Sequence, residues 1–137
     1  MRVYLDTNVL VSAFATRGLC ADVFRHVLTE HDLLTGEVNL TELRRVLRRR
    51  FRVPAPTVAA IEELLRGQEV VPRPRKPYSV PVRDPDDVWV LASAIAGKAD
   101  VLVTGDNVLL ELSGKVPVRI LDARGFWQHI RRKRRSS

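Results

Sequence analysis

Two kinds of apolar pattern alternate along the chain. Longer segments carry apolar residues three or four positions apart, the spacing of an amphipathic helix, at residues 8–14, 19–29, 37–51, 56–66 and 84–96. Short apolar runs, typical of strands buried on both faces of a sheet, lie at residues 2–6, 32–35, 69–71, 101–104 and 118–121. Strands that alternate with helices predict a three-layer α/β/α fold with a central parallel sheet of four or five strands.

The stretch from Asp84 to Asp106 combines a predicted helix with a predicted strand. Asp84 suits the N-cap, Pro85 suits the first helical position, and Gly97 is suited to end the helix. Asp106 comes just after the buried strand that follows. Carboxylates crowded at the ends of one such unit repel one another unless a cation lies among them. The stretch therefore indicates a metal-dependent enzyme rather than a binding module.

Length and composition predict one domain over residues 1–130, followed by a basic C-terminal tail at 131–137 that we expect to be disordered. The one cysteine, Cys20, excludes an internal disulfide and a cysteine metal site. Asp6 and Asn8 interrupt the first apolar segment, which is therefore not a signal peptide. The single cysteine fits a reducing compartment, and no apolar run is long enough to span a bilayer. We expect a cytoplasmic protein without membrane contact.

The net charge of +7 is unevenly distributed along the chain. Six arginines lie within residues 44–52 and five basic residues lie at 131–135, which leaves a net charge of −4 on the remainder. An acidic body with two basic clusters is typical of a protein that binds a phosphate backbone beside a carboxylate metal site. A solvated helix face and a charged, disordered tail would give the same distribution.

Candidate metal ligands follow two of the predicted strands. Asp6 and Asp106 end strands whose carboxyl ends meet at one edge of a parallel sheet, where sites form in such folds. The chain has oxygen donors but no histidine or cysteine cluster, a set that favours Mg²⁺ or Mn²⁺ over zinc. The candidate ligands are Asp6, Glu42, Asp87 and Asp106, with Asp84 as a fifth.

Each of these acids also has an ordinary structural role open to it. Asp6 and Asp84 suit helix N-caps, Asp87 suits a capping box, and Asp106 suits a turn. Glu42 is spaced to pair with an arginine one turn along its helix. Their combination still favours a site, because Asp6 and Asp106 end strands at the same sheet edge. Trp89 and Trp127 are predicted to be core or interface residues rather than surfaces for base stacking. Because Trp89 lies on the acidic helix, a contact of its ring with RNA or with a second subunit stays open.

Four segments in order resemble PIN-domain proteins, and specifically the toxin components of toxin–antitoxin systems related to VapC. They are LDTNVLVSA (residues 5–13), LTELRRVLRRRF (40–51), DPDDVWVLASA (84–94) and ADVLVTGDNVLLEL (99–112). The resemblance covers nearly the whole chain. It departs from the family after Asp106, where Asn107 and Val108 replace a charged pair and an acid.

The resemblance implies an endoribonuclease that hydrolyses RNA phosphodiester bonds with Mg²⁺ or Mn²⁺ as its cofactor. It places the catalytic and metal-binding acids at Asp6, Glu42, Asp87 and Asp106, and the supporting polar residues at Thr7, Asn8 and Thr104. It also implies a homodimer and a cognate antitoxin protein. Arg45, Arg48 and Arg49, or the basic tail, are the candidates for holding the RNA backbone.

Three other functions are compatible with parts of the pattern. A catalytically silent PIN-like module that binds RNA or a partner would retain the fold without the activity. A phosphatase of the haloacid-dehalogenase type needs an aspartate where this chain has Asn8, and Lys98 and Lys115 are poorly placed for its lysine. A flap endonuclease needs insertions for which 137 residues leave no room.

Overall fold

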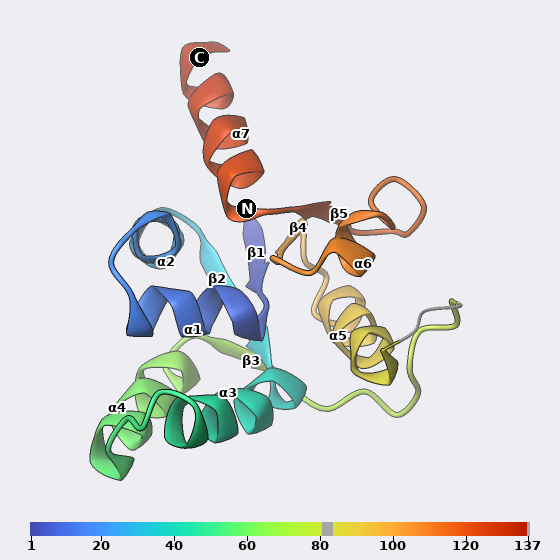
Figure 1. Ribbon diagram of the computed structural model, residues 1–137. Coiled ribbons are helices and arrows are strands. Elements are labelled where there is room, and N and C mark those ends of the chain that lie inside the picture. The colour runs from blue at the N-terminus through green and yellow to red at the C-terminus, as the bar shows by residue number, and fades with distance from the viewer. Residues whose placement is uncertain (81–83, 137) are drawn as a thin grey trace.

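A five-stranded, fully parallel sheet with the strand order β3-β2-β1-β4-β5 forms the centre of the molecule (Figure 1). The computed structural model describes residues 1–80 and 84–136. Its elements in chain order are β1 (Arg2–Leu5), α1 (Thr7–Ala15), α2 (Leu19–Glu30), β2 (Asp32–Gly36), α3 (Glu37–Arg49), α4 (Ala55–Arg66), β3 (Glu69–Val71), α5 (Pro85–Ala96), β4 (Val101–Val103), α6 (Asn107–Leu110), β5 (Arg119–Leu121) and α7 (Ala123–Ser136). The predicted three-layer α/β fold is confirmed.

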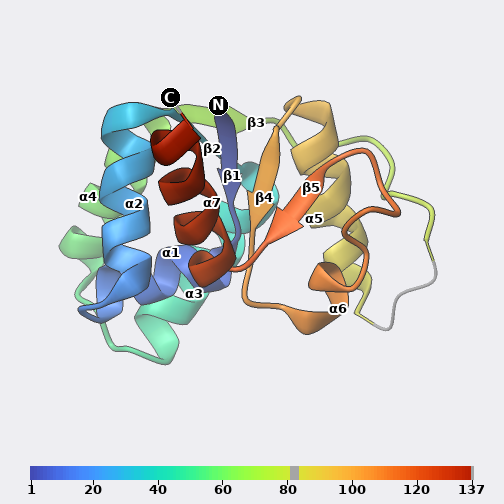
Figure 2. The ribbon, with the colours of Figure 1, turned by 90° about the horizontal axis from the view of Figure 1, so that it is seen from above.

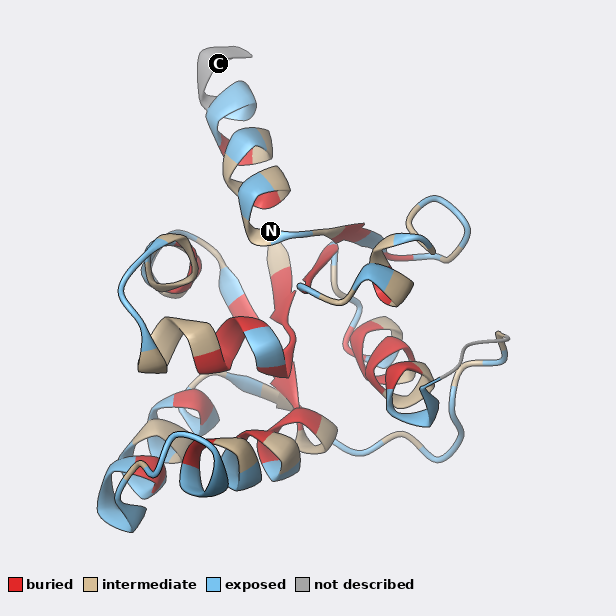
Figure 3. Ribbon diagram, viewed as in Figure 1, coloured by how far each residue is buried: buried red, intermediate tan, exposed pale blue. Residues whose placement is uncertain are grey.

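Helices cover both faces of the sheet, as the view from above shows (Figure 2). Because successive side chains of a strand point to opposite faces, β1 contributes to two separate cores. Val3 and Leu5 pack in the cluster that includes buried residues of α1, α2, α3, α4 and α7. Tyr4 packs in the other cluster, with Leu91 of α5 and Leu109 of α6. The central strands β1, β2 and β4 are buried almost throughout, the edge strands β3 and β5 are buried in part, and the helices are buried along one side (Figure 3).

The predicted start of α5 is confirmed in detail. Asp84 is the N-cap, and its carboxylate accepts a hydrogen bond of 2.9 Å from the backbone N–H of Asp86. Pro85 occupies the first turn, where its missing N–H costs no hydrogen bond. Gly97 ends the helix. This cap fixes where α5 begins and so places Asp86 and Asp87 in its first turn.

The basic segment at the C-terminus continues a helix. The predicted boundary between residues 130 and 131 falls inside α7, which extends from Ala123 to Ser136. Phe126 and Ile130 are buried in the core shared with α2. α7 runs back along the sheet, so that Lys133 Nζ lies 3.7 Å from Met1 Sδ (Figure 2). The basic end of α7 is therefore at the amino edge of the sheet.

Within the described ranges, no helix combines the length and the apolar character needed to cross a lipid bilayer.

Candidate metal centre

Asp6 and Asp106 lie at the carboxyl ends of the adjacent strands β1 and β4. Each is also a helix N-cap: the Asp6 carboxylate accepts from the Thr7 N–H at 2.8 Å, and the Asp106 carboxylate accepts from the Val108 N–H at 2.9 Å. The backbone N–H of Asp6 donates to Val103 of β4 at 3.0 Å. The capping role and the position at the shared sheet edge therefore coexist in both residues.

Helices α3 and α5 bring further carboxylates to the same edge. A cavity of about 90 Å³ is lined by Asp6, Thr7, Asn8, Glu42, Asp84, Asp86, Asp87, Val90 and Asp106. It thus contains the four predicted acids, the fifth candidate Asp84, and two of the three predicted polar residues. Asp86 also lines it and was missed by the sequence argument, although the run DPDD contains it. Its position on the first turn of α5, beside Asp87, is the signal that identifies it.

Hydrogen bonds hold the Asp6 carboxylate in place. Its side chain is buried, with 6% exposed, and it accepts from Thr104 Oγ1 at 2.7 Å and from Asn39 Nδ2 at 2.9 Å. Burial raises the pKa of Asp6, and the neighbouring charge of Asp106 raises it further, while the hydrogen bonds lower it. Asp6 is therefore an acid with a fixed orientation and a disfavoured negative charge.

Asn8 and Thr104 connect the loops that follow β1 and β4. Asn8 Oδ1 accepts from the Gly105 N–H at 2.8 Å, and Asn8 Nδ2 lies 3.4 Å from both Thr104 Oγ1 and Asp6 Oδ2. Thr104 Oγ1 also accepts from the Asp106 N–H at 3.1 Å. These contacts place the two strand-end aspartates relative to each other. They give Asn8 a positioning role, where a phosphatase would need a second aspartate.

A buried network behind Asp6 was missed by the sequence argument. The Tyr4 hydroxyl donates to Asn39 Oδ1 and lies 2.7 Å from Ser93 Oγ, so that the Asn39 amide group is oriented toward Asp6. Gly36 leaves room for it, because a Cβ there would collide with the Tyr4 hydroxyl and with Ser93 Oγ. Asn39 lies four residues before the buried Leu43 and therefore on the apolar face of α3. A polar residue in that position of the sequence could have indicated a buried polar contact.

Asp87 has an oxygen without a hydrogen-bond partner. Among the buried side-chain nitrogen and oxygen atoms of the described residues, Asp87 Oδ2 alone has none. Burial, then the contact with Asp106 and the charges of Asp84 and Asp6, raises the pKa of Asp87 to about 8. Burial also raises the pKa of Glu42, with the charges of Asp6 and Asp86 adding to the effect. The cavity thus concentrates negative charge that the protein itself does not neutralise.

The donor set of the cavity fits a hard divalent cation. Its candidate ligands are all oxygens, and the buried, unpartnered Asp87 Oδ2 is the atom that a cation would satisfy. As the side chains stand, no group of three acidic, histidine or cysteine residues in the described part of the chain is arranged to hold one ion. The carboxylates share a cavity, but they do not form a closed coordination cage.

The predicted RNA-binding arginines differ in position. Arg45 lines a second cavity beside the acidic one, together with Glu42. Arg48 donates to the Val53 carbonyl at 3.1 Å, and Arg49 is exposed one turn beyond Arg45 on α3. The basic end of α7 lies near Met1, at the opposite edge of the sheet from the acids (Figure 2), and a contact between this tail and the RNA backbone stays a prediction. Arg45 is thus the predicted arginine nearest to the acids.

The raised pKa of Asp87 predicts a pH-dependent stability for the metal-free protein. The pKa of Asp87 is about 8 in the folded protein, against an ordinary value of 3.8. Between these two pH values the folded state therefore binds more protons than the unfolded state. The free energy of unfolding therefore falls as the pH rises from about 4 to about 8. Urea unfolding in a chelator at several pH values would measure the slope.

The matched control for that slope is Asp87→Asn, which removes the titrating group while keeping its shape. The lowered pKa values of His31 and His129 act in the opposite sense near neutral pH, so the difference between the two proteins isolates Asp87. Wild type and Asp87→Asn with equal slopes would contradict the interpretation.

Comparison with known proteins gives an independent result. The sequence matches the family model described as the PIN domain over residues 2–108. No curated protein matches the sequence. Among solved structures, the chain is similar to VapBC-1 from nontypeable Haemophilus influenzae, with 20% identity, 90% of this chain and 99% of that chain covered, and a TM-score of 0.62.

Two further structures share the fold. VapBC2 from Rickettsia felis, solved with a DNA fragment from the VapBC2 promoter, matches with 12% identity and a TM-score of 0.60. The match covers 89% of this chain and 98% of that chain. Mycobacterium tuberculosis VapC20, described as a Sarcin-Ricin loop cleaving toxin, matches with 15% identity, coverage of 77% and 90%, and a TM-score of 0.57. With the family match over most of the sequence and the acidic cavity at the sheet edge, the chain belongs to the PIN domain family.

Proposed function

We propose that this protein is an endoribonuclease that depends on Mg²⁺ or Mn²⁺ and acts as the toxin of a toxin–antitoxin pair. The observation that carries the proposal is the cavity into which β1, β4, α3 and α5 each bring a carboxylate. Carboxylates that are buried together raise one another's pKa and are stable as anions only with a positive charge among them. A metal-dependent nuclease uses such a cation to activate a water and to neutralise charge on the phosphate.

The comparisons support the choice of substrate and partner. One protein of the same fold is described as a toxin that cleaves the Sarcin-Ricin loop, and two others are VapBC assemblies. By analogy, the proposed substrate is RNA and the proposed partners are an antitoxin and a second copy of this chain. A protein with these partners would act in the cytoplasm. Co-expression with the product of a neighbouring small gene, followed by size-exclusion chromatography, would measure both associations.

The proposed roles follow from the contacts in the cavity. Asp6, Glu42, Asp87 and Asp106 would hold the cation, with Asp84 as a further candidate, and a bound cation supplies an activated water and neutralises charge developing on the phosphate. Thr104 and Asn39 keep the Asp6 carboxylate directed into the cavity. Thr7 Oγ1 accepts from Asn39 Nδ2 and so connects the start of α1 to α3, while Asn8 Oδ1 accepts from the Gly105 N–H and so holds the loop after β4. Arg45, followed by Arg48 and Arg49 along α3, would contact the RNA backbone.

A second candidate function is a catalytically silent PIN-like module that binds RNA or a partner protein. The observation that favours it is that no three described carboxylates are arranged around one ion position. Such a module would bind RNA without cutting it, and its affinity would not depend on a divalent cation.

One cleavage assay distinguishes these functions. Purified protein is incubated with labelled single-stranded RNA, an RNA hairpin, or branched DNA, in Mg²⁺, Mn²⁺ or EDTA. We expect one of the RNAs to be cut only when a divalent cation is present, and the DNA to stay intact. Equal cleavage in EDTA would exclude a metal-dependent mechanism. RNA binding without cleavage in both cations would favour the silent module.

A further inference from the structure

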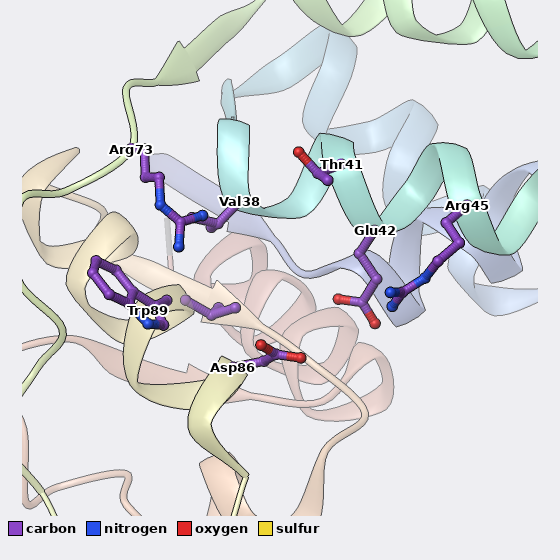
Figure 4. Close-up of a pocket in the computed structure, with 8 residues that line it drawn as sticks. Val38, Thr41, Glu42, Arg45, Arg73, Asp86 and Trp89 are labelled. Carbon is purple, nitrogen blue, oxygen red and sulfur yellow. The ribbon is translucent and has the colours of Figure 1, made fainter.

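A second cavity, of about 150 Å³, lies between α3 and α5 and adjoins the acidic one. The two cavities share Glu42, Asp86 and Val90 as lining residues. Figure 4 shows Arg73 and Trp89 at one side of this cavity, with Arg45 and Glu42 at the other. A ligand in the second cavity would therefore adjoin a ligand bound at the carboxylates of the acidic cavity.

At the wall of this cavity the guanidinium group of Arg73 lies over the ring system of Trp89. The guanidinium carbon of Arg73 lies 4.6 Å from the centre of the Trp89 ring system. Trp89 is half-buried on α5, and Arg73 comes from the exposed segment after β3. Val38 and Val90 add apolar surface. Indole rings and guanidinium planes are the surfaces on which unpaired bases stack in proteins that bind single-stranded nucleic acids.

Charges of both signs line the cavity: Arg45 and Arg73 supply two cations, and Glu42 and Asp86, which it shares with the acidic cavity, supply two carboxylates. Arg45 and Arg73 both line it, and Arg45 lies one turn of α3 from Glu42, toward the acidic centre. Other arginines of the region are already paired: Arg44 lies 3.1 Å from Glu62, and Arg66 bonds Glu37. The stacked pair and Arg45 thus offer one surface for a base and one cation for a phosphate.

We propose that this cavity is a subsite for one unpaired nucleotide of the RNA substrate, next to the bond that is cleaved. The base lies against the Arg73–Trp89 stack, and Arg45 contacts the adjoining phosphate. This inference rests on the proposed nuclease function. The cavity is smaller than the roughly 300 Å³ at which sites for whole small molecules begin, which suits a single base. A base inside a duplex has both faces covered, so the subsite selects single-stranded RNA.

Binding measurements on matched variants test the subsite. All proteins carry Asp106→Asn, so that the RNA is not cut during the measurement. The probe is a fluorescently labelled, unstructured RNA of about 12 nucleotides, and its fluorescence anisotropy in Mg²⁺ gives the binding affinity. We expect Arg73→Ala and Trp89→Leu to weaken binding about tenfold or more, because each removes a stacking partner. Trp89→Phe keeps an aromatic ring and should lose far less. Arg75→Ala removes an exposed arginine from the same segment and controls for charge alone.

A base contact has a signature that a loss of folding does not share. In a series of RNAs, each carries one abasic nucleotide at a different position. With Trp89 present, we expect binding to weaken for one of these positions. In Trp89→Leu, we expect it to weaken for none. Thermal melting checks that each variant is folded. If Trp89→Leu does not fold, the comparison of Trp89→Phe with Arg73→Ala still tests the subsite. Equal affinities for Arg73→Ala and Arg75→Ala, or no position-specific abasic effect, would overturn the subsite.

The outcomes separate the subsite from the nuclease proposal. Wild-type protein that cuts RNA, with variants that bind as tightly as their parent, refutes the subsite alone. Wild-type protein that neither binds nor cuts RNA refutes both. If the variants keep their RNA affinity but lose a complex with a co-expressed protein, the cavity is a protein-binding surface and the nucleotide assignment is wrong.

Discussion

Asp6→Asn and Asp87→Asn are each expected to reduce RNA cleavage by about 100-fold or more while the protein stays folded. Both substitutions keep the shape of the side chain and remove the charge that would hold the cation. Asparagine is also a good N-cap, so Asp6→Asn preserves the bond from the Thr7 N–H. Because burial disfavours the charge of both acids, the melting temperature of each variant should equal or exceed that of the metal-free wild type. Initial rates and thermal melting measure the two effects separately.

Asp22→Asn is the matched control for this loss of activity. Asp22 is an exposed acid on α2 that pairs with Arg25 on the same helix. It is not among the residues lining the acidic cavity. Its substitution removes the same charge from the protein and should leave the cleavage rate unchanged. A cleavage rate at the wild-type level in Asp6→Asn or Asp87→Asn would refute the assignment of the acids.

Mn²⁺ or Mg²⁺ is expected to raise the melting temperature of the wild type by roughly 10 °C at a cation concentration 100 times the dissociation constant. A ligand at that concentration stabilises the folded state by about 2.7 kcal/mol. For a chain of this size each kcal/mol corresponds to about 4 °C. The expected reason is that a bound cation would satisfy Asp87 Oδ2 and would relieve the repulsion among Asp6, Asp87 and Asp106. Differential scanning fluorimetry over a cation titration measures it.

The comparison with Asp87→Asn shows whether the shift comes from the acidic cavity. That variant lacks the unpartnered carboxylate and should gain only a small part of the shift. EDTA should reverse the wild-type shift, and NaCl at matched ionic strength should not reproduce it. A shift of the same size in both proteins would place the cation elsewhere. No shift at any concentration would favour the silent module.

The sequence predicted the acids that belong to local features. Asp6 and Asp106 follow short apolar strands, and Asp84 precedes a proline and an apolar helix, so their neighbours in the chain identify them. Strand ends in a parallel sheet share an edge, which makes the meeting of Asp6 with Asp106 a consequence of the fold class. Glu42 and Asp87 were selected mainly through the family resemblance, because the rotation of a helix about its axis is set by packing.

The contacts between segments distant in sequence could not be predicted in this way. Asn39 is bonded to Tyr4 and Asp6 from a different element, and Arg73 stacks on Trp89 from a segment rich in proline that has no periodic pattern. The sequence left Trp89 open between the core, an interface and a contact with RNA; the structure shows it half-buried and lining a cavity. The basic C-terminal segment, expected as a disordered tail, continues α7.

By itself the sequence determined the fold class, the strand ends and their acids, since hydrophobic period, capping residues and strand length are properties of neighbouring positions. Only the tertiary structure decided which carboxylates share a cavity, which atom in it lacks a partner, and which arginine lies in the cavity beside it. The reason is that burial and electrostatic coupling depend on distances between elements, and these are set by how α3 and α5 pack against the sheet.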